Sequence, residues 1–261
     1  MEWAYIISGF AVGALVGLTG VGGGSLMTPL LIFAFNVPPI IAVGTDLLFA
    51  AITKTGGILS HNRRGTICWN IVGWLSVGSL PTAILTVYLL DTVRATAPDF
   101  HIDTLVNTSL GAALMLTALA LYLKNTIQNT GQSIKKLLPN WKQWRTPVTI
   151  LAGVLLGVLV PITSIGAGAF GAAILLFLYP SLPTMRIVGT DLAHAVPLTA
   201  VAGLGHMQMG TVDFTLLGYL LIGSLPGIYV GSHISTIIPE RIMRPILATM
   251  LLLIGIKFVV A

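Results

Sequence analysis

Four ionisable side chains lie inside long apolar runs of this 261-residue sequence: Asp46, Lys54, Asp191 and His194. A charge placed in hydrocarbon costs about 2.5–3.5 kcal/mol on an insertion scale, so such residues usually bind a solute, carry a proton or brace helices. Lys54 has no basic counterpart in the second half of the chain, where Thr199 takes its place. It is therefore the residue best suited to balance the charge of an anion.

Two glycine-rich breaks interrupt apolar runs at residues 17–25 and 161–169. A break of this kind exposes helix N-termini, whose free N–H groups and dipole attract anions. With nearby hydroxyls, the breaks predict an anion site made by Gly22, Gly23, Gly24, Ser25, Thr28, Lys54, Thr163, Ser164, Gly166 and Gly168. Close helix packing through small residues is the alternative, and it is the better interpretation of any single glycine.

A second group of polar residues follows each break. On a helix starting near Thr45, Asp46 and His61 share one face with Lys54 beside it, and Asp191 and His206 share the corresponding face later in the chain. The pattern predicts a coupling or helix-bracing role for Thr45, Asp46, His61, Thr190, Asp191, His194 and His206. Helix capping by the Thr-Asp pairs, and a boundary position for the two histidines, are the alternatives.

The two halves of the chain repeat each other at a constant offset of 145 residues. The segment 43–47 (Val-Gly-Thr-Asp-Leu) matches 188–192, His61 matches His206, and the Gly-Ser-Leu-Pro segment 78–81 matches 223–226. An internal duplication of this length indicates that the elements positioning the polar residues occur twice.

Composition places these elements in a membrane. The chain is 55% hydrophobic and 8% charged, against about 25% charged in a soluble domain. Apolar segments run over 4–35, 40–60, 67–90, 102–123, 147–179, 185–205, 212–234 and 242–260. The net charge of +5 lies in the breaks between these segments, which argues against nucleic-acid binding. The first segment has no cleavage pattern, so we expect it to be retained.

The two broken segments predict hairpins rather than straight spans. Limbs of about 14 and 11 residues would be only about 21 and 16 Å long, too short to cross a hydrocarbon core of about 30 Å each. Hairpins also place most basic residues on one side of the membrane. We therefore expect an all-α polytopic protein with two inverted repeats, 1–123 and 147–261, joined by a basic amphipathic cytoplasmic linker at 124–146.

The ordered motifs resemble the TauE/SafE sulfite exporter family over essentially the whole chain. They are the Gly-Val-Gly-Gly-Gly break followed by Pro29, the Gly-Thr-Asp elements at 44–46 and 189–191, and the Gly-Ser-Leu-Pro-Gly segment 223–227 with Gly231-Ser232. The resemblance implies a bacterial inner-membrane permease for sulfite, organosulfonates or related anions. The second break departs from the pattern, because it reads Gly166-Ala167-Gly168 instead of a glycine triplet.

The sequence thus predicts an alternating-access exporter of a small sulfur-containing anion, with lipid as its surroundings and no cofactor. The histidines are too scattered to indicate a metal site, and a homo-oligomer is compatible with the sequence. One alternative is an intramembrane serine hydrolase using Ser25 with His194 or His206. Another is an importer of a different small anion.

Overall fold

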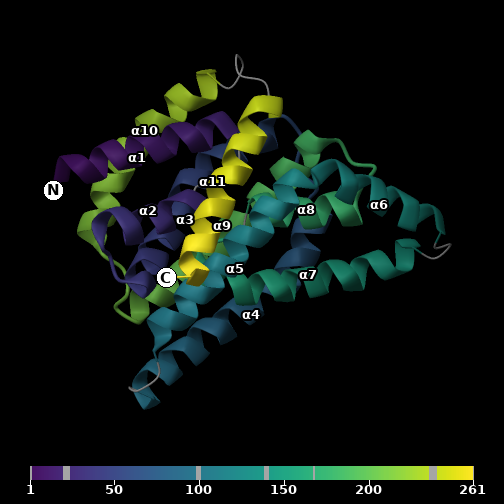
Figure 1. Cartoon of the computed structure of the whole chain (residues 1–261). Helices are drawn as coiled ribbons and strands as arrows, with labels where there is room; N and C mark the ends of the chain where they lie inside the picture. The colour runs from purple at the N-terminus through teal and green to yellow at the C-terminus, as the bar shows by residue number, and fades with distance from the viewer. Residues whose placement is uncertain are drawn as a thin grey trace.

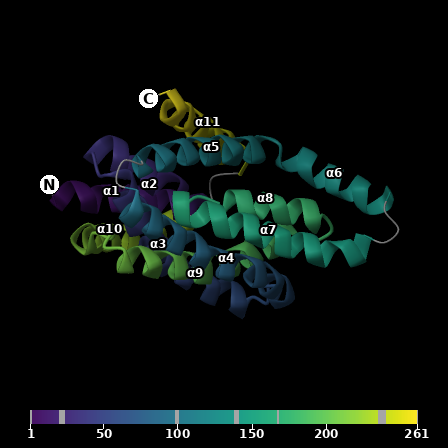
Figure 2. The same ribbon diagram turned by 90° about the horizontal axis from the view of Figure 1, so that it is seen from below.

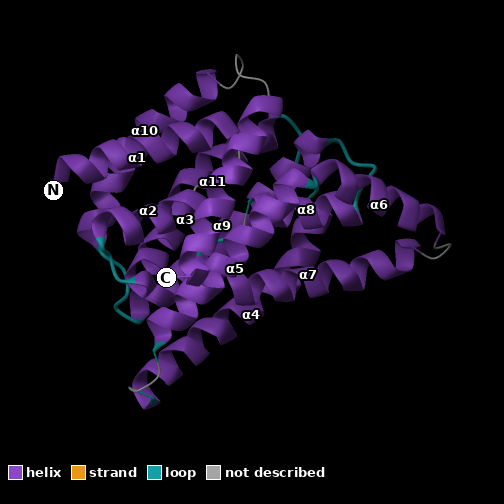
Figure 3. Cartoon of the chain, in the orientation of Figure 1, coloured by secondary structure: helices purple, strands orange, loops and turns teal. Residues whose placement is uncertain are grey.

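The computed structural model describes residues 2–19, 24–97, 101–137, 141–166, 168–234 and 240–260. Within these ranges all regular secondary structure is helical (Figures 1 and 3). The helices are α1 (Glu2–Thr19), α2 (Gly24–Phe35), α3 (Pro39–Arg63), α4 (Trp69–Thr96), α5 (Ile102–Tyr122), α6 (Lys124–Leu137), α7 (Trp141–Thr163), α8 (Ala169–Leu178), α9 (Thr184–Gln208), α10 (Phe214–Ile234) and α11 (Glu240–Val260).

Most of these helices are long and apolar enough to cross a membrane. Seven of the described helices meet this criterion, namely α3, α4, α5, α7, α9, α10 and α11. Large apolar side chains remain exposed on their outer faces, with Leu151 at 69% and Tyr229 at 68%. Water would disfavour such a surface, whereas lipid does not. The chain is therefore a multi-pass membrane protein, and the predicted apolar segments coincide with its helices.

Each predicted broken segment consists of two helices of unequal length. The first limbs, α1 and α7, have 18 and 23 residues, and the second limbs, α2 and α8, have 12 and 10. The lengths are thus about 27 and 35 Å for the first limbs and about 18 and 15 Å for the second. The predicted first limb of about 14 residues was too short. Helix α7 begins at Trp141, inside the predicted linker. The Trp141 side chain is buried at 8% exposure, so this end of α7 packs against the rest of the protein.

Glycines explain why the first limbs extend so far. Gly9, Gly13 and Gly17 recur at every fourth residue of α1 and lie against the backbone of α10 at Leu220, Ser224 and Ile228. A Cβ atom at any of the three would collide with that backbone. Figures 1 and 2 show α1 running along α10. Close packing through small residues is thus the correct interpretation of these glycines.

The sequence repeat has reciprocal contacts in the structure. The backbone N–H of Cys68 donates to the Thr190 hydroxyl at 3.0 Å, and the backbone N–H of Asp213 donates to the Thr45 hydroxyl at 3.0 Å. Each pair is the other shifted by 145 residues. Helices α1–α5 therefore correspond to α7–α11, and the two halves contact each other through equivalent surfaces.

Helices α3 and α9 run antiparallel where the two halves meet. Gly44, near the start of α3, lies against His206 near the end of α9, and Gly189 near the start of α9 lies against His61 near the end of α3. The two glycines permit this approach, because a Cβ at either position would meet the facing residues at less than contact distance. The crossing of α3 and α9 brings together most of the buried polar residues.

Helix α6 joins the two halves at the side of the molecule (Figure 2). Lys135 Nζ donates to Ser181 Oγ at 2.8 Å, and Gln128 Nε2 donates to the Pro180 carbonyl at 3.1 Å. Gly131 lies against the carbonyl of Phe177 in α8. The linker is therefore docked on the turn between α8 and α9.

Candidate functional site

The four intramembrane ionisable residues all lie in the interior where α3 and α9 cross. Asp46 and Lys54 belong to α3 and Asp191 and His194 to α9, and each is at most 5% exposed. The helices begin at Pro39 and Thr184, about two turns before the Thr-Asp pairs. The capping alternative, and the prediction of a helix starting near Thr45, are therefore wrong. Thr45 and Thr190 instead bind backbone N–H groups of the opposite half, as described above.

Helix α2 is tied to this crossing by one hydrogen bond. The Thr28 hydroxyl donates to Oδ2 of Asp46, and both residues are completely buried. Ser25, near the start of α2, is also buried. Gly24 is the first residue of α2, whereas the predicted site residues Gly22 and Gly23 lie outside the described residues. The first break thus reaches the crossing through Thr28.

The second break is held in shape by its own groups. The Thr163 hydroxyl donates to the Leu159 carbonyl at 2.7 Å and accepts from the N–H of Ile165 at 3.1 Å. Ser164, Gly166 and Gly168 have φ values of 55°, 121° and 152°. These values are unfavourable for residues with a Cβ, which suits the two glycines and leaves Ser164 as the strained position. Thr163 therefore maintains the break rather than offering a free hydroxyl.

Both breaks approach the two carboxylates. Ser164 lies beside Asp46. Gly171 in α8 lies against Asp191, so that a Cβ at this glycine would collide with Oδ1 of the carboxylate. The N–H of Gly171 donates to the Gly166 carbonyl at 2.8 Å, which closes the break over the site. Asp46 thus faces groups from both broken segments, and Asp191 faces the second.

Lys54 supplies the positive charge of the polar cluster at the α3–α9 crossing, which consists of Asp46, Lys54, Asp191 and His194 and the groups that contact them. Its ammonium group interacts electrostatically with Asp191 and, less strongly, with Asp46. His194 also lies within the field of this charge. Lys54 is therefore already balanced by carboxylates, and it is not an isolated cation awaiting an anion.

Ser79 of α4 belongs to the cluster and was missed as a site residue in the sequence. Its hydroxyl lies 2.8 Å from Nε2 of His194, and both residues are completely buried. The sequence signal that could have indicated Ser79 was its repetition, since the Gly-Ser-Leu-Pro segment occurs in both halves. The equivalent Ser224 is also completely buried. His194 is thus held by a hydroxyl from a neighbouring helix.

Four polar atoms in the cluster have no hydrogen-bond partner among the described residues. They are Oδ1 of Asp46, Oγ of Ser164, Oδ1 of Asp191 and Nδ1 of His194. Buried polar atoms are nearly always paired, and leaving one unpaired costs about 1–3 kcal/mol. Because Ser164 lies beside the Asp46 carboxylate, Asp191 and His194 are the clearest cases of buried side chains with unused hydrogen-bonding capacity.

Comparison with known proteins assigns this architecture to a family. The profile of the family described as "Sulfite exporter TauE/SafE" matches residues 5–258. The chain belongs to the TauE/SafE family. It is 39% identical to the probable membrane transporter protein YjnA of Bacillus subtilis, over 99% of this chain and 100% of the relative.

More distant relatives have the same general description. The probable membrane transporter protein YdhB of Bacillus subtilis is 29% identical over 94% of this chain and 97% of the relative. The probable membrane transporter protein MJ0441 of Methanocaldococcus jannaschii is 27% identical over 96% of this chain and 92% of the relative. No solved structure matches this chain significantly.

TauE/SafE membership overturns the serine hydrolase alternative, because the family consists of transporters and not of enzymes. The geometry agrees. His194 pairs with Ser79 rather than with Ser25, and its Nδ1 has no orienting partner among the described side chains. A nucleophile-base pair requires such a third group to hold the base.

The two repeated histidines of this TauE/SafE protein lie in different surroundings. Nδ1 of His61 is 2.8 Å from the Thr66 hydroxyl, and Nδ1 of His206 is 2.8 Å from the Thr211 hydroxyl. His206 is buried, and its Nε2 lies 2.9 Å from the Pro161 carbonyl at the second break. His206 is therefore enclosed by protein although it lies near the end of α9, whereas His61 is half-buried.

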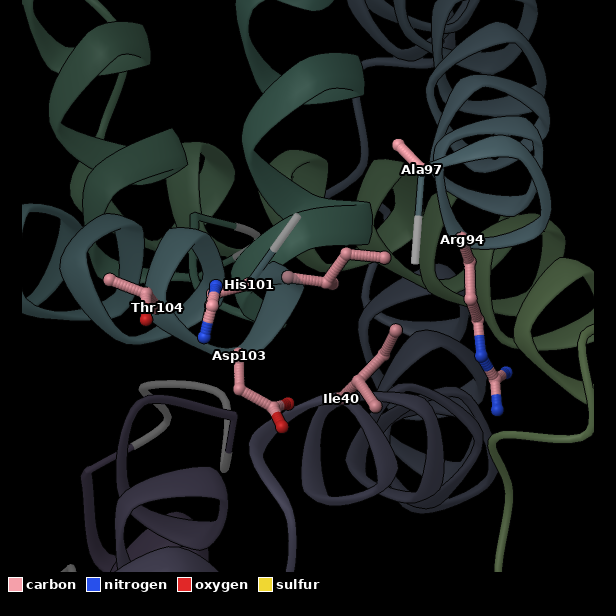
Figure 4. A pocket seen from close by; sticks show the side chains of 7 residues that line it. Ile40, Arg94, Ala97, His101, Asp103 and Thr104 are labelled. Carbon is pink, nitrogen blue, oxygen red and sulfur yellow. The ribbon is translucent and has the colours of Figure 1, made fainter. Parts of the chain in front are cut away.

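A cavity of about 320 Å³ lies near the His206 end of the crossing (Figure 4). Arg94 and Asp103 lie on its wall, and Arg94 Nη1 donates to the Met209 carbonyl just beyond α9 at 2.9 Å. The other lining residues are Ile40, Ala97, His101, Ile102 and Thr104. The wall carries charges of both signs, so this cavity does not select an anion by charge alone.

Replacing Thr28 by Val tests the connection between α2 and the crossing. The Asp46 carboxylate would lose its hydroxyl donor, and a buried acceptor left unpaired costs about 1–3 kcal/mol. We expect Thr28→Val to lower the melting temperature of the detergent-solubilised protein. Thr28→Ser keeps the hydroxyl and should melt close to the wild type. Equal melting of Thr28→Val and the wild type would show that this hydrogen bond does not hold α2.

Proposed function

We propose that this chain is an alternating-access permease that exports small sulfur-containing anions such as sulfite or organosulfonates. The observation that supports this proposal most strongly is the presence of two potential donors without a hydrogen bond to any described residue, Oγ of Ser164 and Nδ1 of His194, at the buried crossing that also holds the Lys54 ammonium group. A compact oxyanion can accept hydrogen bonds from hydroxyl, imidazole and ammonium donors at once. The family name supports the substrate class.

The anion would bind between the two broken segments, near the midplane of the membrane. We assign Ser164 and Lys54 as the side chains that contact it, because the Ser164 hydroxyl beside Asp46 forms no hydrogen bond of normal length with a described residue and Lys54 carries the positive charge. Thr28 and Thr163 would support the site, since their hydroxyls already bind within the protein. Ser25 and the backbone of Gly22–Gly24, Gly166 and Gly168 complete the proposed binding group.

We further propose that the two repeats are inverted in the membrane, with α6 in the cytoplasm. The antiparallel packing of α3 against α9 supports this arrangement. Helices α5 and α11 give the same support, because Tyr122 near the end of α5 lies 2.6 Å from Thr249 in the first half of α11, whereas Gly111 lies against Val259. If α1 with α2, and α7 with α8, each form a hairpin that returns to the side it entered from, the full crossings are α3, α4 and α5 in one repeat and α9, α10 and α11 in the other. Three is an odd number, so the two copies would have opposite orientations.

Alternating access would exchange the two ends of the α3–α9 crossing. At one end His206 binds both Thr211 and the Pro161 carbonyl, whereas at the other end His61 binds Thr66 and is half-buried. Because the two ends are equivalent in sequence, the opposite state would be obtained when the repeats exchange these conformations. The histidines and the Thr45 and Thr190 contacts would then brace the moving helices.

Anion flux into liposomes tests the proposed function. We expect the reconstituted protein to move labelled sulfite or methanesulfonate faster than empty liposomes do. Lys54→Gln should lower the flux about tenfold or more, because a charge-assisted hydrogen bond is worth about 1.5–3 kcal/mol. Lys136→Gln, at an exposed position on α6, is the matched control and should transport normally. No flux of any sulfur-containing anion would refute the substrate class, and full flux in Lys54→Gln would remove Lys54 from the site.

Cysteine labelling tests the inverted arrangement. Cys68 is the only cysteine of the chain, and it bonds to Thr190 through its backbone N–H and not through its thiol. Cys68→Ser therefore gives a cysteine-free protein into which single cysteines can be introduced. Ser133→Cys in α6 and Val260→Cys at the end of α11 are both exposed. A membrane-impermeant maleimide should label Val260→Cys in intact cells and Ser133→Cys only after permeabilisation. Labelling of both positions from the same side would contradict the inversion.

A further inference from the structure

The cluster at the α3–α9 crossing contains more negative than positive charge. Two carboxylates, Asp46 and Asp191, face one ammonium group, Lys54, among the described residues of the cluster. With a neutral His194 the formal charge is −1. An anion added to this cluster would raise it to −2 in a buried region, where like charges repel strongly. Binding of an anion therefore requires that one negative charge be removed.

The surroundings of the two carboxylates differ. Asp46 accepts a hydrogen bond from Thr28. Asp191 is the carboxylate whose charge interacts most strongly with Lys54, and its Oδ1 has no donor among the described residues. An anion that binds beside Lys54 would add a second negative charge near the Asp191 carboxylate and compete with it for the Lys54 charge. A buried carboxylate that has lost its counter-ion is neutralised by a proton.

The elements packed around Asp191 leave no competing group on which the proton is better placed. Helix α3 contributes Lys54 and Asp46, and α9 contributes His194 on the same face. The backbone of Gly171 in α8 lies against Asp191, Ser79 of α4 binds His194, and the Ser164 hydroxyl that follows α7 lies beside Asp46; none of these groups titrates near neutral pH. Nε2 of His194 is already engaged by Ser79.

We propose that the anion is carried together with one proton, which Asp191 takes up when the anion binds beside Lys54. The empty site holds two carboxylates and one ammonium, and the loaded site holds one carboxylate, one carboxylic acid, one ammonium and one anion. Both states have a formal charge of −1, so loading does not change the buried charge. The proton comes from water on the side where the anion enters and leaves with the anion on the other side.

This inference rests on the proposed function and deepens it by naming the coupling ion. Coupling of this kind operates in either direction, depending on the gradients. Export against an inward proton gradient requires a larger outward gradient of the anion.

Proton-driven accumulation of methanesulfonate in liposomes tests the coupling. This anion has no proton to lose near neutral pH, so any proton that moves with it is bound by the protein. With the membrane potential clamped and an alkaline interior, wild-type protein should concentrate labelled methanesulfonate several-fold relative to empty liposomes. Absence of pH-driven accumulation in wild-type liposomes that exchange methanesulfonate would overturn the coupling while leaving the transport function intact.

Asp191→Asn separates the two functions. Its amide imitates the protonated acid but cannot release a proton, so pH-driven accumulation should fall to the background of empty liposomes, a much larger loss than that of anion-for-anion exchange. Asp91→Asn is the matched control, because Asp91 is exposed near the end of α4 and lies outside the cluster, and this variant should retain accumulation. Accumulation by Asp191→Asn equal to the wild type would exclude Asp191 as the proton carrier. Absence of exchange in the wild type would refute the proposed function and the coupling together.

Discussion

The pairing of buried polar groups at the α3–α9 crossing is the constraint on which the rest of the structure depends. In a protein surrounded by lipid, a charge or hydroxyl on the lipid side cannot hydrogen-bond to water and must find its partner within the protein. Asp46 is paired with Thr28 and His194 with Ser79, and Lys54 is buried in the same region as the two carboxylates. These interactions connect α2, α3, α4 and α9, so the helices that surround the site are fixed by the same groups that would bind a solute.

Close backbone packing makes this arrangement possible. Glycines on α1 let it lie against α10, and Gly78 and Gly153 do the same between α4 and α7. These two helix pairs are equivalent under the internal repeat. They leave α3 and α9 enclosed at the centre, where the two halves contact each other through the reciprocal Thr45 and Thr190 hydrogen bonds. The duplication thus produces a pair of similar surfaces that enclose one asymmetric polar site.

The sequence was sufficient for the membrane segments, the family and the burial of the four ionisable residues, because long apolar runs and a constant offset are local or periodic signals. It was insufficient for the lengths of the first limbs, since these depend on glycine contacts with helices distant in the chain. The Ser79–His194 pair was missed for the same reason, because its members are 115 residues apart. Thr163 was predicted to bind solute, but its hydroxyl holds the second break, an interaction that depends on the local backbone path.

The most direct test of the anion site is the melting temperature of the purified protein during a titration with sulfite. A ligand that binds the folded state stabilises it in proportion to the logarithm of its concentration above the dissociation constant. The structure predicts a sulfite-dependent rise in the wild type and a much smaller rise in Lys54→Gln. An equal rise in both proteins would contradict an anion site at the α3–α9 crossing.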